Sequence, residues 1–189
     1  MPAVIRTSLA AAGRLSKATS GMAAVEFALT LPFLVALLFT GIDVTEAVSA
    51  RRKAVTASST ISDLISQAKE VYDADIQNAF TAGTAIMTPF AAANFSAVIS
   101  NVTMNATGAP VVSWSKGYNA TGRATGSTID IPTELKAPNS SLVVAEVTYT
   151  YKPMVGYKLT GDILMPKITY AMPRVASKTT GVPCKWSGC

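Results

Sequence analysis

Few residues of this chain are of the types that carry out catalysis. The 189-residue sequence contains no histidine, which is the commonest general base and metal ligand. The acids that follow the predicted helices are scattered, at Asp130, Glu134, Glu146 and Asp162. Neither a glycine-rich phosphate loop nor a nucleophile elbow occurs. The sequence therefore predicts no enzyme activity, no catalytic residue, no cofactor and no small-molecule substrate.

One acid, Glu26, lies where an acid is energetically unfavourable. It stands near the start of an apolar run, and residues 27–42 carry no charge. Counted from Met22 to Ile42 the run has 21 residues. At 1.5 Å per residue it forms roughly 31 Å of helix, which matches a bilayer hydrocarbon core of about 30 Å. A carboxylate in such a segment is disfavoured by about 2.5–3.5 kcal/mol at the centre and less near an end, so it usually has a function.

Two explanations account for Glu26. The first is electrostatic, because an acid in the first helical turn faces the positive end of the helix dipole and can reach the membrane interface. The second takes Gly21 as the last residue of a leader. Cleavage between Gly21 and Met22 would leave a new amino group four residues before Glu26. Helical side chains meet at that spacing, so amine and carboxylate can neutralise each other within one chain or between neighbours.

The order of these residues resembles a known family. A short basic leader ending in Gly21, with Glu26-Phe27 opening an apolar helix, is similar to the precursors of type IV pilins. The longer run GMAAVEFALTLPFLVALLFTGI, which contains Pro32 and Gly41, resembles the TadE-like minor pilins, or pseudopilins, of the tight-adherence (Flp) pilus. The downstream segments ISDLISQ, IMTPF, VSWSKGYN and VVAEVTYTYKP extend this resemblance over most of the chain after Gly21.

The resemblance implies a function in pilus assembly and a set of partners. A prepilin peptidase would cut between Gly21 and Met22. Glu26 and Phe27 would then set the register of the helix against other pilins and pilus-assembly proteins of the same system. Pro32 would let the helix bend where subunits pack. A proline in any helix also removes one backbone hydrogen bond, so an ordinary kink is an equal alternative.

Positive charge is concentrated at the amino end of the chain. The first 21 residues hold Arg6, Arg14 and Lys17 without an acid, which accounts for +3 of the formal net charge of +5. These charges favour a cytoplasmic amino end, a single pass through the inner-membrane lipid and a periplasmic domain, although residues 51–53 are also basic. No basic stripe with interleaved aromatic residues is present, so nucleic acid is not an expected partner.

Two other functions stay open from the sequence. A secretory signal peptide also has a positive start and an apolar core, and residues 48–50 before Arg51 form an acceptable small-residue cleavage site. Asp43 and Glu46 lie between that core and the site, which argues against a secreted soluble domain cut after Ala50. Alternatively, an uncleaved helix would anchor a periplasmic binding or scaffolding domain.

Cys184 and Cys189 are the only cysteines, and both lie in the last six residues. Two thiols without histidine make a poor metal site, since structural zinc takes four ligands. In an oxidising periplasm the pair can form a disulfide, with free thiols or bonds to another protein as alternatives. So short a loop adds little stability. Trp186 between the cysteines either docks the tail or is exposed.

The hydrophobic period predicts one long helix from about Met22 to Val71 and a second from Ala74 to Met87. In the part of the long helix after the membrane, the apolar positions recur at spacings of three and four. These positions should face the domain, and they are Val44, Val48, Val55, Ile61, Leu64, Ile65, Ala68 and Tyr72.

From Ala97 onward the composition changes to Val, Thr, Ile and Tyr with turn residues, which predicts strands. We expect these at residues 97–106, 111–117, 142–151 and 163–172. Alternation over residues 146–151 indicates a sheet with one buried face, and residues 118–141 form mostly loop.

The fold class is therefore α+β, with a long amino-terminal transmembrane and amphipathic helix packed on a small antiparallel sheet. The resemblance implies the same pilin-like fold. The expected organisation is a cytoplasmic leader (1–21), a transmembrane assembly helix (22–42) and a periplasmic domain (43–189). This domain would include the helix continuation to about residue 71 and the cysteine-containing tail.

Overall fold

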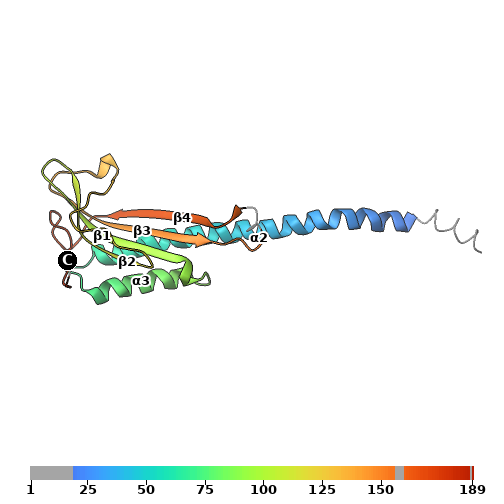
Figure 1. The fold of residues 1–189 in the computed structure, drawn as a ribbon, viewed down its shortest axis with the longest axis horizontal. Coiled ribbons are helices and arrows are strands. Elements are labelled where there is room, and N and C mark those ends of the chain that lie inside the picture. The colour runs from blue at the N-terminus through green and yellow to red at the C-terminus, as the bar shows by residue number, and fades with distance from the viewer. Residues whose placement is uncertain (1–18, 156–159, 188) are drawn as a thin grey trace, which may run out of the picture. The chain divides into compact units, whose positions relative to one another are not determined.

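The computed structural model describes residues 19–155, 160–187 and 189 (Figure 1). The leader residues Arg6, Arg14 and Lys17 lie outside the described residues. The chain forms two compact units, Met1–Val44 and Thr45–Cys189.

The first helix, α2, covers Thr19–Ser66. It begins before the expected Met22 and ends before the expected Val71. The early end has a physical cause, because the Ser66 hydroxyl donates to the Asp63 carbonyl (2.9 Å) and the Ser66 carbonyl accepts the N–H of Arg174 (2.8 Å). Val71 instead forms a parallel bridge with Cys184. Contacts with the carboxy-terminal tail thus replace the last helical turn.

The second unit holds a four-stranded antiparallel sheet in the order β2-β1-β3-β4. Its elements are α3 (Asp73–Met87), β1 (Phe95–Met104), β2 (Pro110–Tyr118), β3 (Ser141–Tyr151) and β4 (Ile163–Ala171), with short 3-10 turns at Ala92–Asn94 and Thr133–Leu135. The α+β class is confirmed, and each strand lies close to its predicted bounds.

The main core of the second unit lies between the sheet and the helices α2 and α3 (Figure 1). The predicted face of α2 is partly wrong. Ile61 and Ile65 are buried, but the other large side chains of that set are exposed, namely Val44, Val48, Val55, Leu64 and Tyr72. The buried positions are mostly small: Ala50, Ala54, Ala57, Ser58 and Ser62. Small side chains let the helix backbone approach the sheet, and Ser58 Oγ reaches the Ala145 carbonyl at 3.1 Å.

A second, smaller core covers part of the opposite sheet face. Ile129 and Ile131, from the segment between β2 and β3, pack there with Val102, Leu142 and Val144. The burial of β3 alternates from Ala145 onward, as predicted, but residues 141–145 are buried on both faces. The expected loop is therefore a cover for one end of the sheet.

Lys53 joins α2 to the end of α3. Its Nζ donates to the carbonyls of Ile86 (3.1 Å) and Thr88 (2.6 Å). A cation at the carboxy end of a helix satisfies carbonyls that lack helical partners and faces the negative end of the dipole. At the other end of α3, the Asp75 carboxylate accepts the N–H of Tyr72 (2.9 Å), which fixes the start of that helix.

Candidate functional site

The apolar segment of α2 presents an uncovered surface. Every residue from Gly21 to Ile42 is exposed, including Phe27 at 60% and Phe33 at 72%. Within the described residues α2 is the one helix with the length and composition of a membrane-spanning segment, and an 18-residue stretch of it has a mean hydropathy of 2.2. An apolar surface this large is buried by lipid or by other helices. One long apolar amino-terminal helix is what a single-pass anchor requires.

Glu26 is the one charged residue between Gly21 and Ile42. Its side chain is exposed, and no described residue forms an ion pair or hydrogen bond with its carboxylate. Because α2 begins at Thr19, its first turn contains no acid and Glu26 falls in a later turn. The expectation that Glu26 faces the positive end of the helix dipole, an effect concentrated in the first turn, stays a prediction.

Gly21 has no steric reason to be glycine in this structure. It lies inside α2, and a Cβ built on it would meet nothing within 4 Å. Glycine in a helix is less favourable than alanine by about 1 kcal/mol. Met22, the next residue, is 68% exposed and lies four residues before Glu26 on the same helix. Packing and helix propensity therefore do not explain the glycine.

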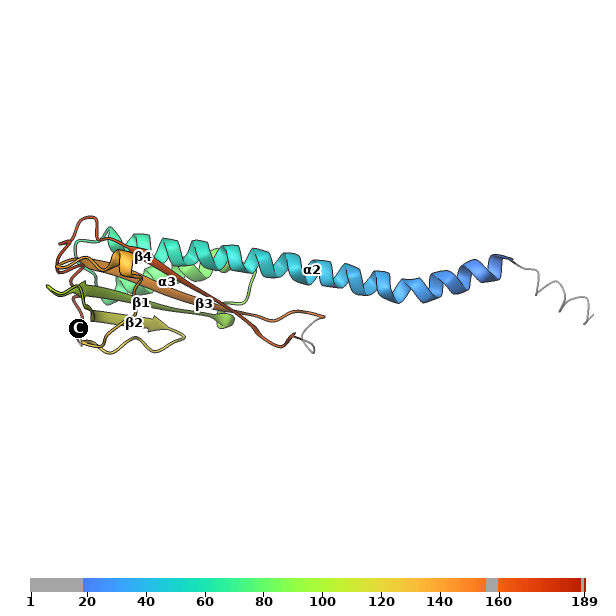
Figure 2. The same ribbon diagram turned by 90° about the horizontal axis from the view of Figure 1, so that it is seen from above.

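Pro32 lies within α2, which continues as an α-helix on both sides of it. A proline lacks the N–H that would reach the carbonyl four residues before it, here that of Ala28. Figure 2 shows a bend in the amino-terminal, blue part of α2. Thr30 Oγ1 donates to the carbonyls of Glu26 (3.1 Å) and Phe27 (3.2 Å), so this polar side chain is satisfied within the helix.

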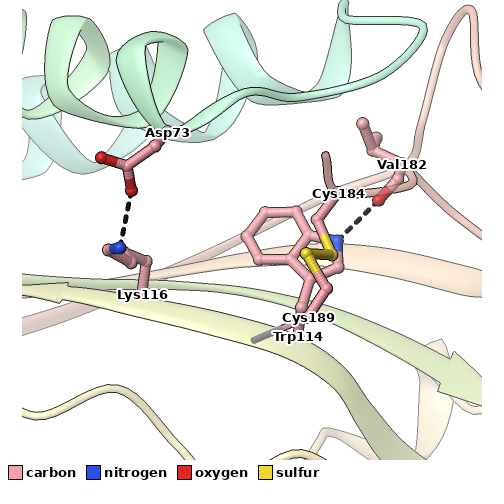
Figure 3. The surroundings of a disulfide bond; sticks show 6 residues. All are labelled: Asp73, Trp114, Lys116, Val182, Cys184 and Cys189. Carbon is pink, nitrogen blue, oxygen red and sulfur yellow. Dashed lines mark hydrogen bonds and ion pairs between the residues drawn. A yellow bond between two sulfur atoms is a disulfide. The ribbon is translucent and has the colours of Figure 1, made fainter. Parts of the chain in front are cut away.

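The two cysteines lie in the second unit, where the structure joins Cys184 to Cys189 with a Cα–Cα distance of 6.1 Å. Figure 3 shows the two sulfur atoms beside the indole of Trp114. Trp114 Nε1 donates to the Val182 carbonyl at 2.6 Å. Trp186 packs edge-on against Trp114 with ring centroids 5.3 Å apart, so it docks the tail.

Sequence reasoning missed the residues that hold this tail. Asn101 is buried on β1, donates to the Thr180 carbonyl (3.2 Å) and accepts the N–H of Val182 (3.2 Å). Lys116 pairs with Asp73 at 2.6 Å (Figure 3). Its Nζ also lies 5.8 Å from the centroid of the Trp186 ring. A buried Asn in a strand is the one signal in the sequence that could have pointed to a long-range polar contact.

The predicted site residues thus fall into two groups. Gly21, Met22, Glu26, Phe27 and Pro32 follow one another along the exposed part of α2, whereas the cysteines belong to the tail of the second unit. No group of three or more potential metal-ligating side chains occurs among the residues that the structure describes.

Comparison with known proteins gives one match. The family model of TadE-like proteins matches residues 21–62, which is the described part of α2 from Gly21 almost to its end. No curated protein and no solved structure matches the chain. On the evidence of this helix, residues 21–62 of the chain are similar to the TadE-like family.

Proposed function

We propose that this chain is a minor pilin, or pseudopilin, of a Tad (Flp-type) adherence pilus, cut between Gly21 and Met22 by a prepilin peptidase. The similarity of residues 21–62 to TadE-like proteins supports a role in biogenesis of that pilus. The observation that carries the finer proposal is the uncovered apolar segment of α2, in which Gly21 has no packing function and Glu26 has no described partner.

In this proposal the parts of the chain have separate roles. Residues 1–21 form a cytoplasmic leader, residues 22–42 a transmembrane assembly helix and residues 43–189 a periplasmic domain. The amino group of Met22 neutralises Glu26 of the same or a neighbouring chain, and Phe27 packs against other pilins. Pro32 lets the helix bend during packing. In the oxidising periplasm the disulfide between Cys184 and Cys189 persists.

Processing is tested by the intact mass of the protein isolated from its own host. A chain that starts at Met22 supports the proposal. A chain that retains its leader would favour the uncleaved anchor, and one that starts at Arg51 would favour a secreted soluble domain.

The cleavage residue is tested by Gly21→Leu. The substitution should leave uncut precursor in the membrane, because a peptidase that recognises glycine cannot accept the larger side chain. Gly41→Leu is the matched control, since a Cβ there also meets nothing within 4 Å. The control should be cut normally, and normal cutting of Gly21→Leu would refute the assigned site.

The role of Glu26 is tested by Glu26→Ala and Glu26→Gln. Both proteins should be cut normally, while the number of pili per cell falls to background, because the amine of Met22 loses its counter-charge. The glutamine variant keeps the shape and hydrogen-bonding capacity of the side chain, so its failure assigns the effect to charge. Wild-type numbers of pili in both variants would exclude the assembly role.

A further inference from the structure

One end of the second unit lies close, along the chain, to the apolar segment of α2. Thr45, the first residue of the unit, follows Ile42 by three residues. The next residue is Glu46, whose carboxylate accepts a hydrogen bond from the hydroxyl of Tyr151 (3.4 Å). Tyr151 is the last residue of β3 and lies opposite Ile163, the first residue of β4. The β3–β4 hairpin therefore meets α2 at this end, which we call the near end.

The chain itself limits the distance between the near end and a membrane. Four residues span at most about 14 Å even when fully extended. Glu46 follows Ile42 by four residues, so it lies within that distance of Ile42 in every orientation of the second unit. In the proposed function Ile42 is the last residue of the transmembrane segment, and the present inference rests on that anchor. Glu46 is therefore held close to the bilayer surface.

Three exposed basic residues are found at the near end. Arg51 and Arg52 follow Glu46 on α2 by about 8 Å along the helix axis, and Lys152 follows Tyr151 directly. Within the described ranges 19–155 and 160–187, no acid pairs with any of the three. By contrast, other described basic residues of the second unit do form ion pairs, namely Lys116, Arg123, Lys136, Arg174 and Lys185.

The two arginines differ from the lysine beside them. Lys53 is used inside the unit, because its Nζ donates to the carbonyls of Ile86 and Thr88. Arg51 and Arg52 are exposed instead. Long side chains on an α-helix point back toward its amino end. We therefore expect both guanidinium groups to be directed toward the near end.

The acids near this end do not cancel the positive charge. The carboxylate of Glu46 is half-buried and bonded to Tyr151, and Asp43, which precedes the second unit, is 8% exposed. Of the acids described at the near end, Asp162 alone is exposed. Three exposed cations thus stand against one exposed anion.

Exposed apolar side chains accompany these charges on the hairpin. Met154 and Val155 follow Lys152 closely and are 72% and 51% exposed, and Leu164 of β4 is 65% exposed. Basic side chains place their charged ends at the lipid headgroups, while apolar side chains next to them enter the boundary between headgroups and acyl chains. The near end has both kinds of side chain.

We propose that the near end of the second unit binds the surface of the bilayer that holds α2. Arg51, Arg52 and Lys152 bind the phosphate groups of anionic lipid headgroups, and Met154 and Val155 enter the interface beside them. Arginine suits this role because its planar guanidinium donates two parallel hydrogen bonds to a phosphate. Together with α2, this second attachment fixes how the unit stands on the membrane.

The first test is the reactivity of lysines in the full chain, reconstituted in lipid nanodiscs. One nanodisc contains phosphatidylcholine alone, and the other contains phosphatidylcholine with phosphatidylglycerol. An amine-reactive reagent is added, and modification of each lysine is followed by mass spectrometry of peptides. A basic residue close to an anionic surface favours the bound state about fivefold. We expect Lys152 to react at least fivefold more slowly in the anionic nanodisc.

Lys69 and Lys178 are internal controls in the same sample. Both are exposed, and neither has a described side-chain partner. Lys69 follows the end of α2 at Ser66, which is about 30 Å along the helix from Glu46. That distance is about three Debye lengths at 0.1 M salt, so the surface charge is screened there. Both control lysines should react equally fast in the two nanodiscs.

A pair of charge variants provides the second test. Arg51→Gln/Arg52→Gln and Lys69→Gln/Lys178→Gln each remove two exposed positive charges, so their net charges are equal. In the anionic nanodisc Lys152 should react at least threefold faster in the arginine variant than in wild type, because the surface contact is weakened. In the lysine variant its rate should stay that of wild type. Equal rates of Lys152 in the two variants would contradict the proposal.

Three further results would overturn the inference. The first is an equal rate of Lys152 in the two nanodiscs. The second is equal slowing of Lys69 and Lys178, which would mean a general effect of lipid charge. The third is the same protection of Lys152 by inorganic phosphate in the neutral nanodisc, which would mean a site for a soluble anion.

Failure of the proposed function is distinguishable from these results. A chain that does not enter nanodiscs at all would refute the membrane anchor, and this inference with it. A chain that enters them without protection of Lys152 refutes the surface contact alone. Leader cleavage is not required, so a chain that is never cut at Gly21 can still show the protection.

Discussion

Gly21 and Gly41 of the first unit have surroundings opposite to those of Gly83 and Gly181 of the second. A Cβ on Gly21 or Gly41 would meet nothing within 4 Å, whereas one on Gly83 would lie 2.6 Å from Ile61 Cδ1 and one on Gly181 2.1 Å from Asn101 Oδ1. The second unit therefore needs glycine for its own packing. In the first unit the reason for glycine has to come from outside the chain.

The aromatic residues show the same difference between packed and open surroundings. Phe95 is fully buried in the second unit, while Phe27 of the first is 60% exposed. Within the second unit, removal of a side chain changes the free energy of unfolding. Substitutions in the apolar part of α2 should instead change processing, membrane insertion or assembly, with little effect on the fold of the second unit.

The largest effect on folding should come from Trp114→Ala. Trp114 is 3% exposed, its Nε1 bonds the Val182 carbonyl, and its ring packs on Trp186. We expect the free energy of unfolding to fall by about 3–5 kcal/mol, measured by thermal unfolding in detergent. Phe27→Ala is the comparison and should stay within about 0.5 kcal/mol. A small loss for Trp114→Ala would break the contrast between the units.

Gly83→Ala should have an intermediate effect. The added methyl group would press on Ile61 and on the ring of Phe95 at 3.4 Å, and overpacking costs about 1–3 kcal/mol. Gly41→Ala is the matched control in the open part of α2 and should be neutral or slightly stabilising, because alanine is the better helix former. If both substitutions lower the free energy of unfolding equally, Gly41 is packed against other residues in the folded protein, which would contradict the contrast between the units.

The sequence predicted the elements of this fold better than the contacts between them. Strands and α3 were found because their period and their start and stop residues are local signals. The face of α2 is different, because Val48 and Val55 dominate its pattern of large apolar residues, whereas the buried Ala50 and Ala54 contribute little to it. Small residues are weakly hydrophobic, yet they permit the closest approach of a helix to a sheet.

The candidate site divides in the same way. Gly21 and Glu26 were identified from the sequence, since their significance lies in type and spacing along one helix. Asn101 could not be, because its role depends on Thr180 and Val182, which are distant in the sequence. The contact between Tyr151 and Glu46, which places Lys152 at the near end, depends in the same way on residues distant in the sequence.

Replacement of both cysteines by serine should have a smaller effect. Closing so short a loop removes limited entropy from the unfolded chain, and the loop-closure relation gives at most about 2 kcal/mol. Trp186→Ala loses the edge-on contact with Trp114. This loss should lower the free energy of unfolding by about 0.5–1.5 kcal/mol, in addition to the loss from the buried area of the side chain. If the double serine variant unfolds at a far lower temperature than the Trp114→Ala protein, the disulfide rather than the tryptophan pair holds the tail.

The smallest effect should be a pH dependence at the tail. The Tyr72 hydroxyl donates to Glu70 Oε1 (2.6 Å), and this hydrogen bond, followed by the charge of Lys185, lowers the pKa of the Glu70 carboxyl below its usual value. A carboxyl whose pKa is lower in the folded state stabilises the fold above its unfolded pKa of about 4.3, and this contribution is lost as the pH falls through the folded pKa. Tyr72→Phe should therefore melt slightly below wild type at pH 7, and the difference should vanish in acid.

Tyr118→Phe is the control, because the described contacts of the Tyr118 ring are with other aromatic rings. Its difference from wild type should not change with pH. A difference for Tyr72→Phe that persists at pH 3 would assign the effect to packing of the ring.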